Sequence, residues 1–168
     1  LDEEKHRIIK RVIHASADLD YLRTLHFSED AVQKALEALK NGATIVTDTN
    51  MVRAGINKAG MDKLGCKVVC YMADPDVAAQ AKIEGSTRAA ACMEKACLIE
   101  GPVIIAIGNA PTALVRLDEL IKAGKIKPEL IIGVPVGFVN VVEAKELIMQ
   151  AGVPYIVARG RKGGSNVA

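Results

Sequence analysis

The sequence predicts an α/β fold, with a mainly parallel sheet of about five strands and helices on both faces. Short apolar segments alternate along the chain with segments of helical periodicity, which is the order that produces parallel strand pairing. The apolar segments are continuous, as in strands that are covered on both faces. Glycines stand where several helical segments end. The predicted architecture is therefore a three-layer, Rossmann-like domain.

Two helices are expected before the first strand. Residues 3–15 carry apolar side chains at helical spacing: Ile8, Ile9, Val12 and Ile13. Ser28, followed by two acidic residues, is typical of a helix cap and first turn. This second helix is expected to end before Gly42.

Further strands and helices follow in alternation. The strands are expected at 43–47, 67–71, 103–107, 130–134 and 155–158. The helical patterns cover about 75–99, 112–123 and 141–151. No repeat or linker interrupts this order, so residues 1–168 are expected to form one domain. Because the chain starts at a leucine and stops within a glycine-rich run, this domain is expected to lack some residues at both ends.

Composition narrows the classes of partner. Half of the residues are apolar, but no run approaches the ~20 residues that cross a bilayer, so no membrane contact is expected. A net charge of +2, two Phe, three Tyr and no Trp argue against a nucleic-acid partner. The four cysteines match no CxxC spacing. We expect buried free thiols in a reducing cytoplasm and no metal site.

The candidates for a ligand site follow the expected strands. In an open parallel sheet, ligands bind beyond the carboxyl ends of the strands. Four of the segments at these ends are polar or glycine-rich: 48–52, 108–112, 135–140 and 159–165. We expect these four loops to converge at one edge of the sheet.

The turn at 108–112 has the composition of an anion site. Gly108 permits a tight bend, Asn109 tolerates a left-handed backbone and Pro111 suits the first helical position. Amide donors at such a helix start would face a small anionic ligand. The alternative is a compact connection between strand and helix, because these residue types are also ordinary in turns.

A row of cations lies on the first expected helix. Arg7, Arg11 and His14 fall at i, i+4 and i+7, beside the apolar stripe. Alone, such a row is typical of a solvated face. His14, however, stands where the helix ends, and there the helix dipole favours the histidine cation. His14 is therefore a candidate proton donor and acceptor, whereas His6 and His26 are expected to be structural.

A second polar helix start is expected at 85–91. Thr87 offers a hydroxyl, and Arg88 in the first turn could bind a carboxylate through both of its terminal nitrogens. The alternative is a helix cap followed by a good helix former. Further along, Glu143 and Lys145 lie too close in sequence to face each other on a helix.

The sequence lacks the glycine-rich fingerprint of dinucleotide sites. No strand is followed by G-x-G-x-x-G, and the tail at 160–164 resembles it only loosely. Asp48 stands where a phosphate-binding turn would be needed, and a carboxylate suits phosphate poorly. We therefore expect no dinucleotide cofactor. The alternative, a nucleotide-binding oxidoreductase or methyltransferase, would be excluded by a failure to bind NAD or S-adenosylmethionine in calorimetry.

Six motifs occur in order along nearly the whole chain. They are R-V-I-H-A at 11–15, D-x-x-M-V at 48–52, G-x-T-R-x-A-A at 85–91, G-N-A-P-T-A-L at 108–114, G-x-P-V-G-F-V at 133–139 and R-G-x-x-G-G-S at 159–165. Each is weak alone, but six at these intervals form a specific pattern. Together they resemble the precorrin-8X methylmutase family, also called precorrin isomerase.

The resemblance implies an isomerase of cobalamin biosynthesis that uses no cofactor. Members of the family move a methyl group from C-11 to C-12 of the corrin ring of precorrin-8X or cobalt-precorrin-8, which gives hydrogenobyrinate or cobyrinate. They are homodimers with the site near the interface. The corrinoid tetrapyrrole substrate is fringed with carboxylates, which agrees with the row of cations.

By the same resemblance, His14 is the catalytic proton donor and acceptor, and Arg11 binds substrate. The matching loops imply the following further substrate-binding residues: Thr87, Arg88, Asn109, Thr112, Gly137 and Arg159. The turn at 108–112 then becomes a wall of the corrinoid pocket. A further contact of the family lies upstream of residue 1. The alternative function is a corrinoid-binding or delivery protein without catalysis, because binding uses the same cations and loops.

Overall fold

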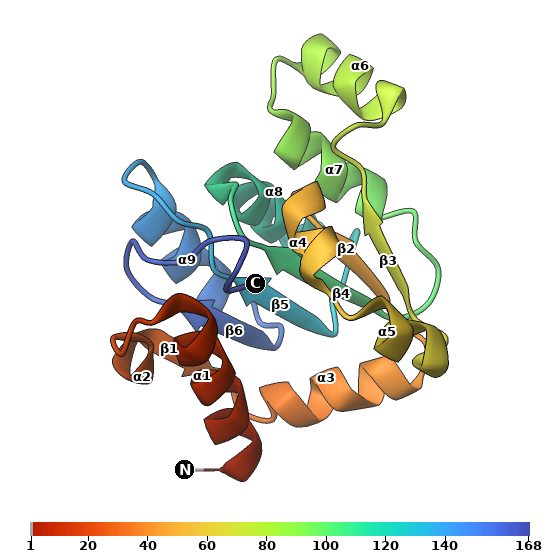
Figure 1. Ribbon diagram of the computed structural model, residues 1–168. Helices are drawn as coiled ribbons and strands as arrows, with labels where there is room; N and C mark the ends of the chain where they lie inside the picture. The colour runs from red at the N-terminus through yellow and green to blue at the C-terminus, as the bar shows by residue number, and fades with distance from the viewer. Residues whose placement is uncertain (1) are drawn as a thin grey trace.

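The computed structural model describes residues 2–168 and contains one six-stranded sheet in the order β1-β6-β5-β4-β2-β3 (Figure 1). All five expected strands are present, and they pair in parallel. They are β2 (Thr44–Thr47), β3 (Lys67–Cys70), β4 (Val103–Ile107), β5 (Leu130–Gly133) and β6 (Tyr155–Ala158). The prediction of a mainly parallel sheet is confirmed.

The sixth strand was not predicted. β1 (Leu25–Phe27) pairs antiparallel with β6 at the edge of the sheet. With three residues it is too short to show a period in the sequence. It exists because the edge of β6 offers it hydrogen bonds.

Two apolar cores lie on opposite faces of the sheet. Successive side chains of a strand point to opposite sides, so Ile105 belongs to one core and its neighbour Ile104 to the other. The Ile105 face is covered by α7 (Arg88–Ala96), α8 (Pro111–Lys122) and α9 (Val141–Met149). The Ile104 face is covered by α1 (Glu3–Ser16) and α3 (Ala31–Lys40). Figure 1 shows the resulting helix–sheet–helix layers, which confirm the predicted architecture.

Three short helices escaped prediction because each covers fewer than three turns. They are α2 (Tyr21–Thr24), α4 (Asn50–Gly55) and α5 (Lys58–Leu64). Side-chain caps start two of them: Thr49 accepts a hydrogen bond from the amide of Val52 at α4, and Asn57 accepts one from Gly60 at α5. The helix α4 follows β2 directly and so lies at the carboxyl edge of the sheet (Figure 1).

The helical pattern over 75–99 is divided between two helices, and the second starts within 85–91, as expected. α6 (Pro75–Glu84) ends at Gly85, whose φ of 63° is left-handed, and α7 starts after Thr87. A left-handed glycine closes a helix, so the chain turns there, and α6 projects away from the sheet (Figure 1).

The expected cap at Ser28 was also wrong. α3 starts after Asp30, and the Ser28 hydroxyl instead accepts a 2.8 Å hydrogen bond from the amide of Tyr155. A serine near a helix start can serve either role, and here the neighbouring strand β6 supplies the donor. Within residues 2–168 no helix is long and apolar enough to cross a membrane.

Candidate active site at the carboxyl edge of the sheet

The loops that follow β2, β4, β5 and β6 meet, as the sequence predicted. The Thr49 and Ser165 hydroxyls lie 3.2 Å apart and so join the loop after β2 to the loop after β6. The amide of Gly164 donates to the carbonyl of Val134, at the end of β5, across 2.8 Å. The glycine-rich segment 159–165 is thus the element on which the other loops pack. We call it the β6 loop.

The β6 loop approaches its neighbours too closely for side chains at two positions. A Cβ on Gly163 would lie 2.1 Å from the carbonyl oxygen of Val134. A Cβ on Gly108 would lie 2.9 Å from both Ser165 Cα and Val52 Cγ2. Neither Gly108 nor Asn109 has a positive φ, so the left-handed backbone that Asn109 would tolerate is not adopted. Close packing, rather than a bend, requires glycine at residue 108.

The amides of the turn at 108–112 do not face an external anion. The carboxylate of Asp48, which is fully buried, accepts hydrogen bonds from Gly108, Asn109 and Ala110 at 3.0, 2.8 and 2.7 Å. Pro111 does begin α8, as predicted. The expectation of a small anionic ligand on these amides was therefore wrong, because the protein supplies the negative charge itself.

Thr87 and Thr112 lie together at the starts of α7 and α8. The Thr87 hydroxyl accepts from the amide of Ala90 and donates to the Thr112 hydroxyl across 3.0 Å. Both threonines line a surface cavity of about 410 Å³. The remaining lining includes three glutamates and one arginine: Glu84, Glu94, Glu119 and Arg116. The predicted alternative of a helix cap is thus confirmed for Thr87, whose neighbour Arg88 is exposed.

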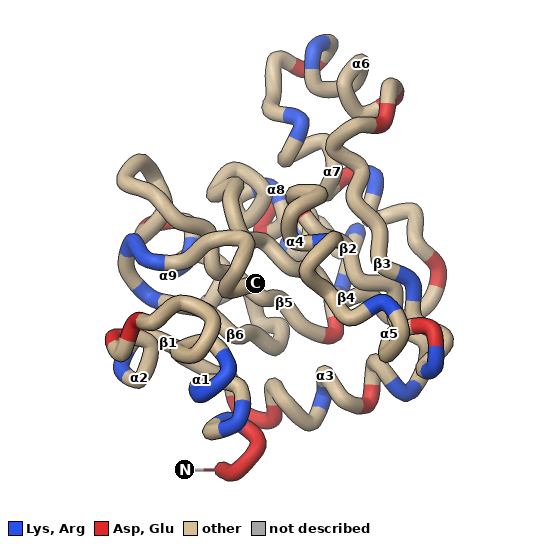
Figure 2. Tube along the Cα trace, viewed as in Figure 1, with Lys and Arg blue, Asp and Glu red and all other residues tan. Residues whose placement is uncertain are grey.

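His14 lies in the last turn of α1 and is exposed. The helix ends two residues later, at Ser16, and Ala17 closes it in a left-handed conformation. Figure 2 shows that α1 begins acidic and becomes basic. Of the two arginines before His14, Arg7 is paired with Glu3 at 2.8 Å, whereas Arg11 has no carboxylate within ion-pair distance among residues 2–168.

The end of α1 is tied to the β6 loop by one lysine. Lys162 donates to the carboxylates of Asp18 and Asp20, both at 2.6 Å. These bonds to Lys162 lower the pKa of Asp18 and that of Asp20. Two segments more than 140 residues apart in sequence are thereby joined beside His14.

Arg159 is engaged within the protein. Its guanidinium makes a bidentate ion pair with Glu146 of α9, in which Nε and Nη2 lie 2.7 and 2.9 Å from the two carboxylate oxygens. The amide of Gly137, another expected binding residue, donates to the carbonyl of Arg161. Arg159 therefore belongs to the β6 loop, and Gly137 is hydrogen-bonded to that loop. Within residues 2–168, the side chains of His14, Arg11 and Arg88 form no hydrogen bond or ion pair with another predicted site residue.

Sequence reasoning missed a buried lysine at this edge. Lys145 is fully buried in α9, and its Nζ donates to the carbonyls of Gly160 and Lys162 at 2.8 and 2.9 Å. Burial lowers its pKa to about 8. A signal was present, because Lys145 shares the apolar face of α9 with Val141, Ala144 and Ile148.

Exposed apolar side chains surround this edge. Met51 follows β2, and Phe138 and Val139 follow β5; they are 71%, 87% and 78% exposed. The guanidinium of Arg161 lies 6.0 Å from the centre of the Phe138 ring. Exposed apolar groups in one region are typical of a ligand or partner surface.

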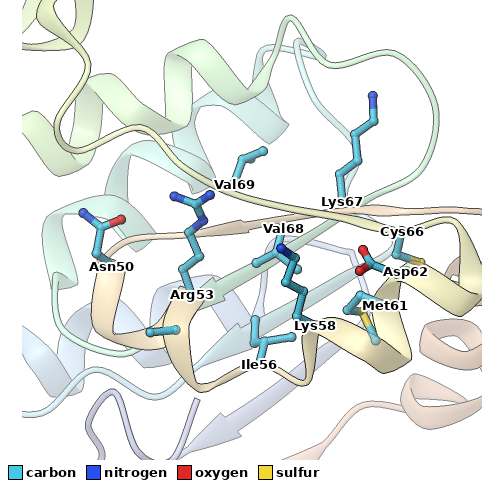
Figure 3. A pocket seen from close by; sticks show the side chains of 11 residues that line it. Asn50, Arg53, Ile56, Lys58, Met61, Asp62, Cys66, Lys67, Val68 and Val69 are labelled. Carbon is cyan, nitrogen blue, oxygen red and sulfur yellow. The ribbon is translucent and has the colours of Figure 1, made fainter.

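A separate cavity of about 680 Å³ lies between α4, α5 and β3. Figure 3 shows Arg53, Lys58 and Lys67 around it, together with the apolar side chains of Ile56 and Val68. None of the predicted site residues lines this cavity. It opens beside the edge strand β3, and Asn50 of the segment after β2 is part of its lining.

The predicted thiols are free and at least half-buried. Cys66 and Cys92 are buried, whereas Cys70 and Cys97 are partly exposed. Burial raises the pKa of the Cys92 thiol to about 12, so this side chain is not a nucleophile at neutral pH.

Together the fold and the converging loops define the class: a doubly wound α/β domain whose loops meet at the carboxyl edge of a parallel sheet, the edge where such domains bind ligands. Residues 1–168 match the precorrin-8X methylmutase family. The chain belongs to this family, whose members are isomerases of cobalamin biosynthesis, and it is an enzyme of that kind.

Individual relatives support the assignment over almost the full chain. A cobalt-precorrin-8 methylmutase of Priestia megaterium is 46% identical, over 98% of this chain and 73% of the relative. A precorrin-8X methylmutase of Pseudomonas aeruginosa is 42% identical, over 96% and 78%. The crystal structure of the precorrin-8X methylmutase from Thermus thermophilus superposes with a TM-score of 0.90 at 40% identity, covering 99% of this chain and 82% of that one.

Proposed function

We propose that the chain moves a methyl group from C-11 to C-12 of the ring of precorrin-8X or cobalt-precorrin-8, with His14 as proton donor and acceptor. The observation that carries the proposal is the placement of His14. Its imidazole is exposed in the last turn of a 14-residue helix, where it is open to a substrate.

The proposed reaction is balanced without an oxidant or a reductant. His14, as imidazolium, gives a proton to the macrocycle, and the positive charge on the ring eases the methyl migration. The bond from C-11 to the methyl carbon breaks as the bond to C-12 forms. Loss of the proton back to the imidazole then completes an isomerisation.

The carboxylates of the substrate would meet cations that the protein leaves free. Arg11 and Arg88 are exposed, and within residues 2–168 neither forms an ion pair. Arg159 would have to leave Glu146 to bind substrate. Asn109, Thr112, Thr87 and Gly137 would line the ring, and the exposed side chains of Met51 and Phe138 suit its apolar surface.

A homodimer in the cytoplasm completes the proposal. The exposed apolar residues of the loop after β5 suit a contact with a second copy, and free thiols suit a reducing compartment. Analytical ultracentrifugation tests the dimer, which a monomer at micromolar concentration would contradict.

Conversion of precorrin-8X, followed by its visible spectrum, tests the activity. The wild-type chain should turn substrate into stable product, whereas a delivery protein would bind it without conversion. H14A should lower kcat by about 10²- to 10⁴-fold, the range for a positioned acid. H6A, on the exposed side of the same helix, is the matched control and should leave kcat unchanged. Full turnover by a folded H14A would remove His14 from this role.

A further inference from the structure

Two lysines form a continuous link between the β6 loop and the turn of α1 that carries His14. The first is Lys145, whose buried Nζ holds the carbonyls on either side of Arg161. These two hydrogen bonds hold the backbone of the β6 loop in one conformation. The second is Lys162, which leaves that loop and bridges two aspartates beside α1.

Hydrogen bonds continue from Lys162 into the last turn of α1. One carboxylate oxygen of Asp18 accepts from Lys162, and the other accepts from the amide of Asp20. The amide of Asp18 in turn donates to the hydroxyl of Ser16, and that hydroxyl donates to the carbonyl of Val12. Val12 and Ser16 flank His14 in sequence, so this chain of contacts reaches the helical turn that carries His14.

The ion pairs of Lys162 are too exposed to be explained by a contribution to folding stability alone. The side chain of Lys162 is 49% exposed and those of Asp18 and Asp20 are 28% and 40% exposed. Ion pairs of this exposure contribute little to the free energy of unfolding. Such ion pairs can nevertheless hold a side chain in one orientation. A displacement of a reacting group by about 1 Å can lower the reaction rate by about 10²-fold.

We propose that Lys162 is a positioning residue, which orients the last turn of α1 and the His14 imidazole towards the substrate loops, with Lys145 holding the β6 loop from which Lys162 extends. This inference rests on the proposed role of His14. It assigns to Lys162 no contact with substrate.

The test compares K162M, K162R and K95M. Lys95 is the matched control, because it also bridges two aspartates, Asp74 and Asp76, at 2.6 and 2.9 Å, but lies on α7 away from α1. K162M should lower kcat by about 10-fold or more, leave KM within about 2-fold and change Tm no more than K95M does. K162R, which keeps the cation, should restore most of kcat, and K95M should leave kcat unchanged.

Two outcomes of the single variants would overturn the inference. One is wild-type kcat in K162M; the other is a fall in kcat that K162R does not restore. The double variant of K162M and H14A tests whether Lys162 acts through His14, whereas H14A alone tests the proposed function. If Lys162 acts through His14, the double variant should turn over no more slowly than H14A alone. An H14A enzyme with full activity would instead contradict the proposed function, and a further loss on adding K162M would show that Lys162 acts elsewhere.

Discussion

The carboxylate of Asp48 accepts a 2.7 Å hydrogen bond from the main-chain amide of Ala110, at the start of α8. Two further amides of the same turn donate to it. The position that the sequence suggested for an external anion is thus occupied by a charge of the protein itself.

Replacing this carboxylate should destabilise the fold. D48N replaces one of the two accepting oxygens of a fully buried side chain by an NH2 group, which cannot accept, so the free energy of unfolding should fall by about 1–3 kcal/mol. Urea denaturation measures the change. D118N is the matched control, because buried Asp118 accepts one hydrogen bond, from Lys122, and should lose less. Equal losses in the two variants would contradict the special role of Asp48.

Lys145 should make stability depend on pH. Because burial lowers its pKa from 10.5 to about 8, the unfolded chain binds a proton that the folded protein has released between these values. The contribution of Lys145 to the free energy of unfolding should therefore rise with pH in this window, by at most about 1.4 kcal/mol per pH unit. Below pH 8 both states are protonated and this slope disappears.

Urea denaturation of wild type and K145M at several values between about pH 7 and pH 10 isolates this effect. The slope of wild type minus variant should be positive above pH 8. K34M removes an exposed lysine of α3 and should leave the wild-type slope unchanged. Parallel curves for wild type and K145M would mean that Lys145 does not titrate in this range.

Two arginines of α1 should differ in their effect on substrate binding. Arg11 is free of carboxylates within 2–168, whereas Arg7 is already neutralised by Glu3. R11A should weaken substrate affinity, by about 10-fold for one lost charged hydrogen bond. R7A should change it little. Substrate titration followed by absorbance compares the two, and the same affinity in R11A and wild type would count against the assignment of Arg11.

Much of the fold could be predicted because it follows from local patterns. The strands β2 to β6 are apolar runs, and a run of this kind is buried wherever it pairs. The helix start after Gly85 was predicted from the residues at 85–91, but the end of α6 at Gly85 was not, because a glycine inside a helical pattern can also be tolerated. β1 left no signal of its own, since its pairing depends on β6, more than 120 residues away.

The location of the candidate site could be predicted from the sequence, but the hydrogen bonds and ion pairs within it could not. Rules for parallel sheets brought four loops to one edge, and that convergence is confirmed by Thr49 with Ser165 and by Gly164 with Val134. The partners of charged groups could not be predicted in this way. Asp48 meets amides 60 to 62 residues further along, and Lys145 meets carbonyls 15 and 17 residues away.

The sequence by itself determined the order of helices and strands, the edge where the loops meet and, through six motifs, the family. These depend on burial periodicity and on residue types at fixed intervals, which the chain carries whatever its contacts. Only the tertiary structure decided which charged side chains are bound to other groups of the protein, as are Asp48 and Arg159, and which form no ion pair within residues 2–168, as is the case for Arg11. The reason is physical: a hydrogen bond or ion pair depends on distances of about 3 Å between atoms that folding brings together from distant parts of the chain.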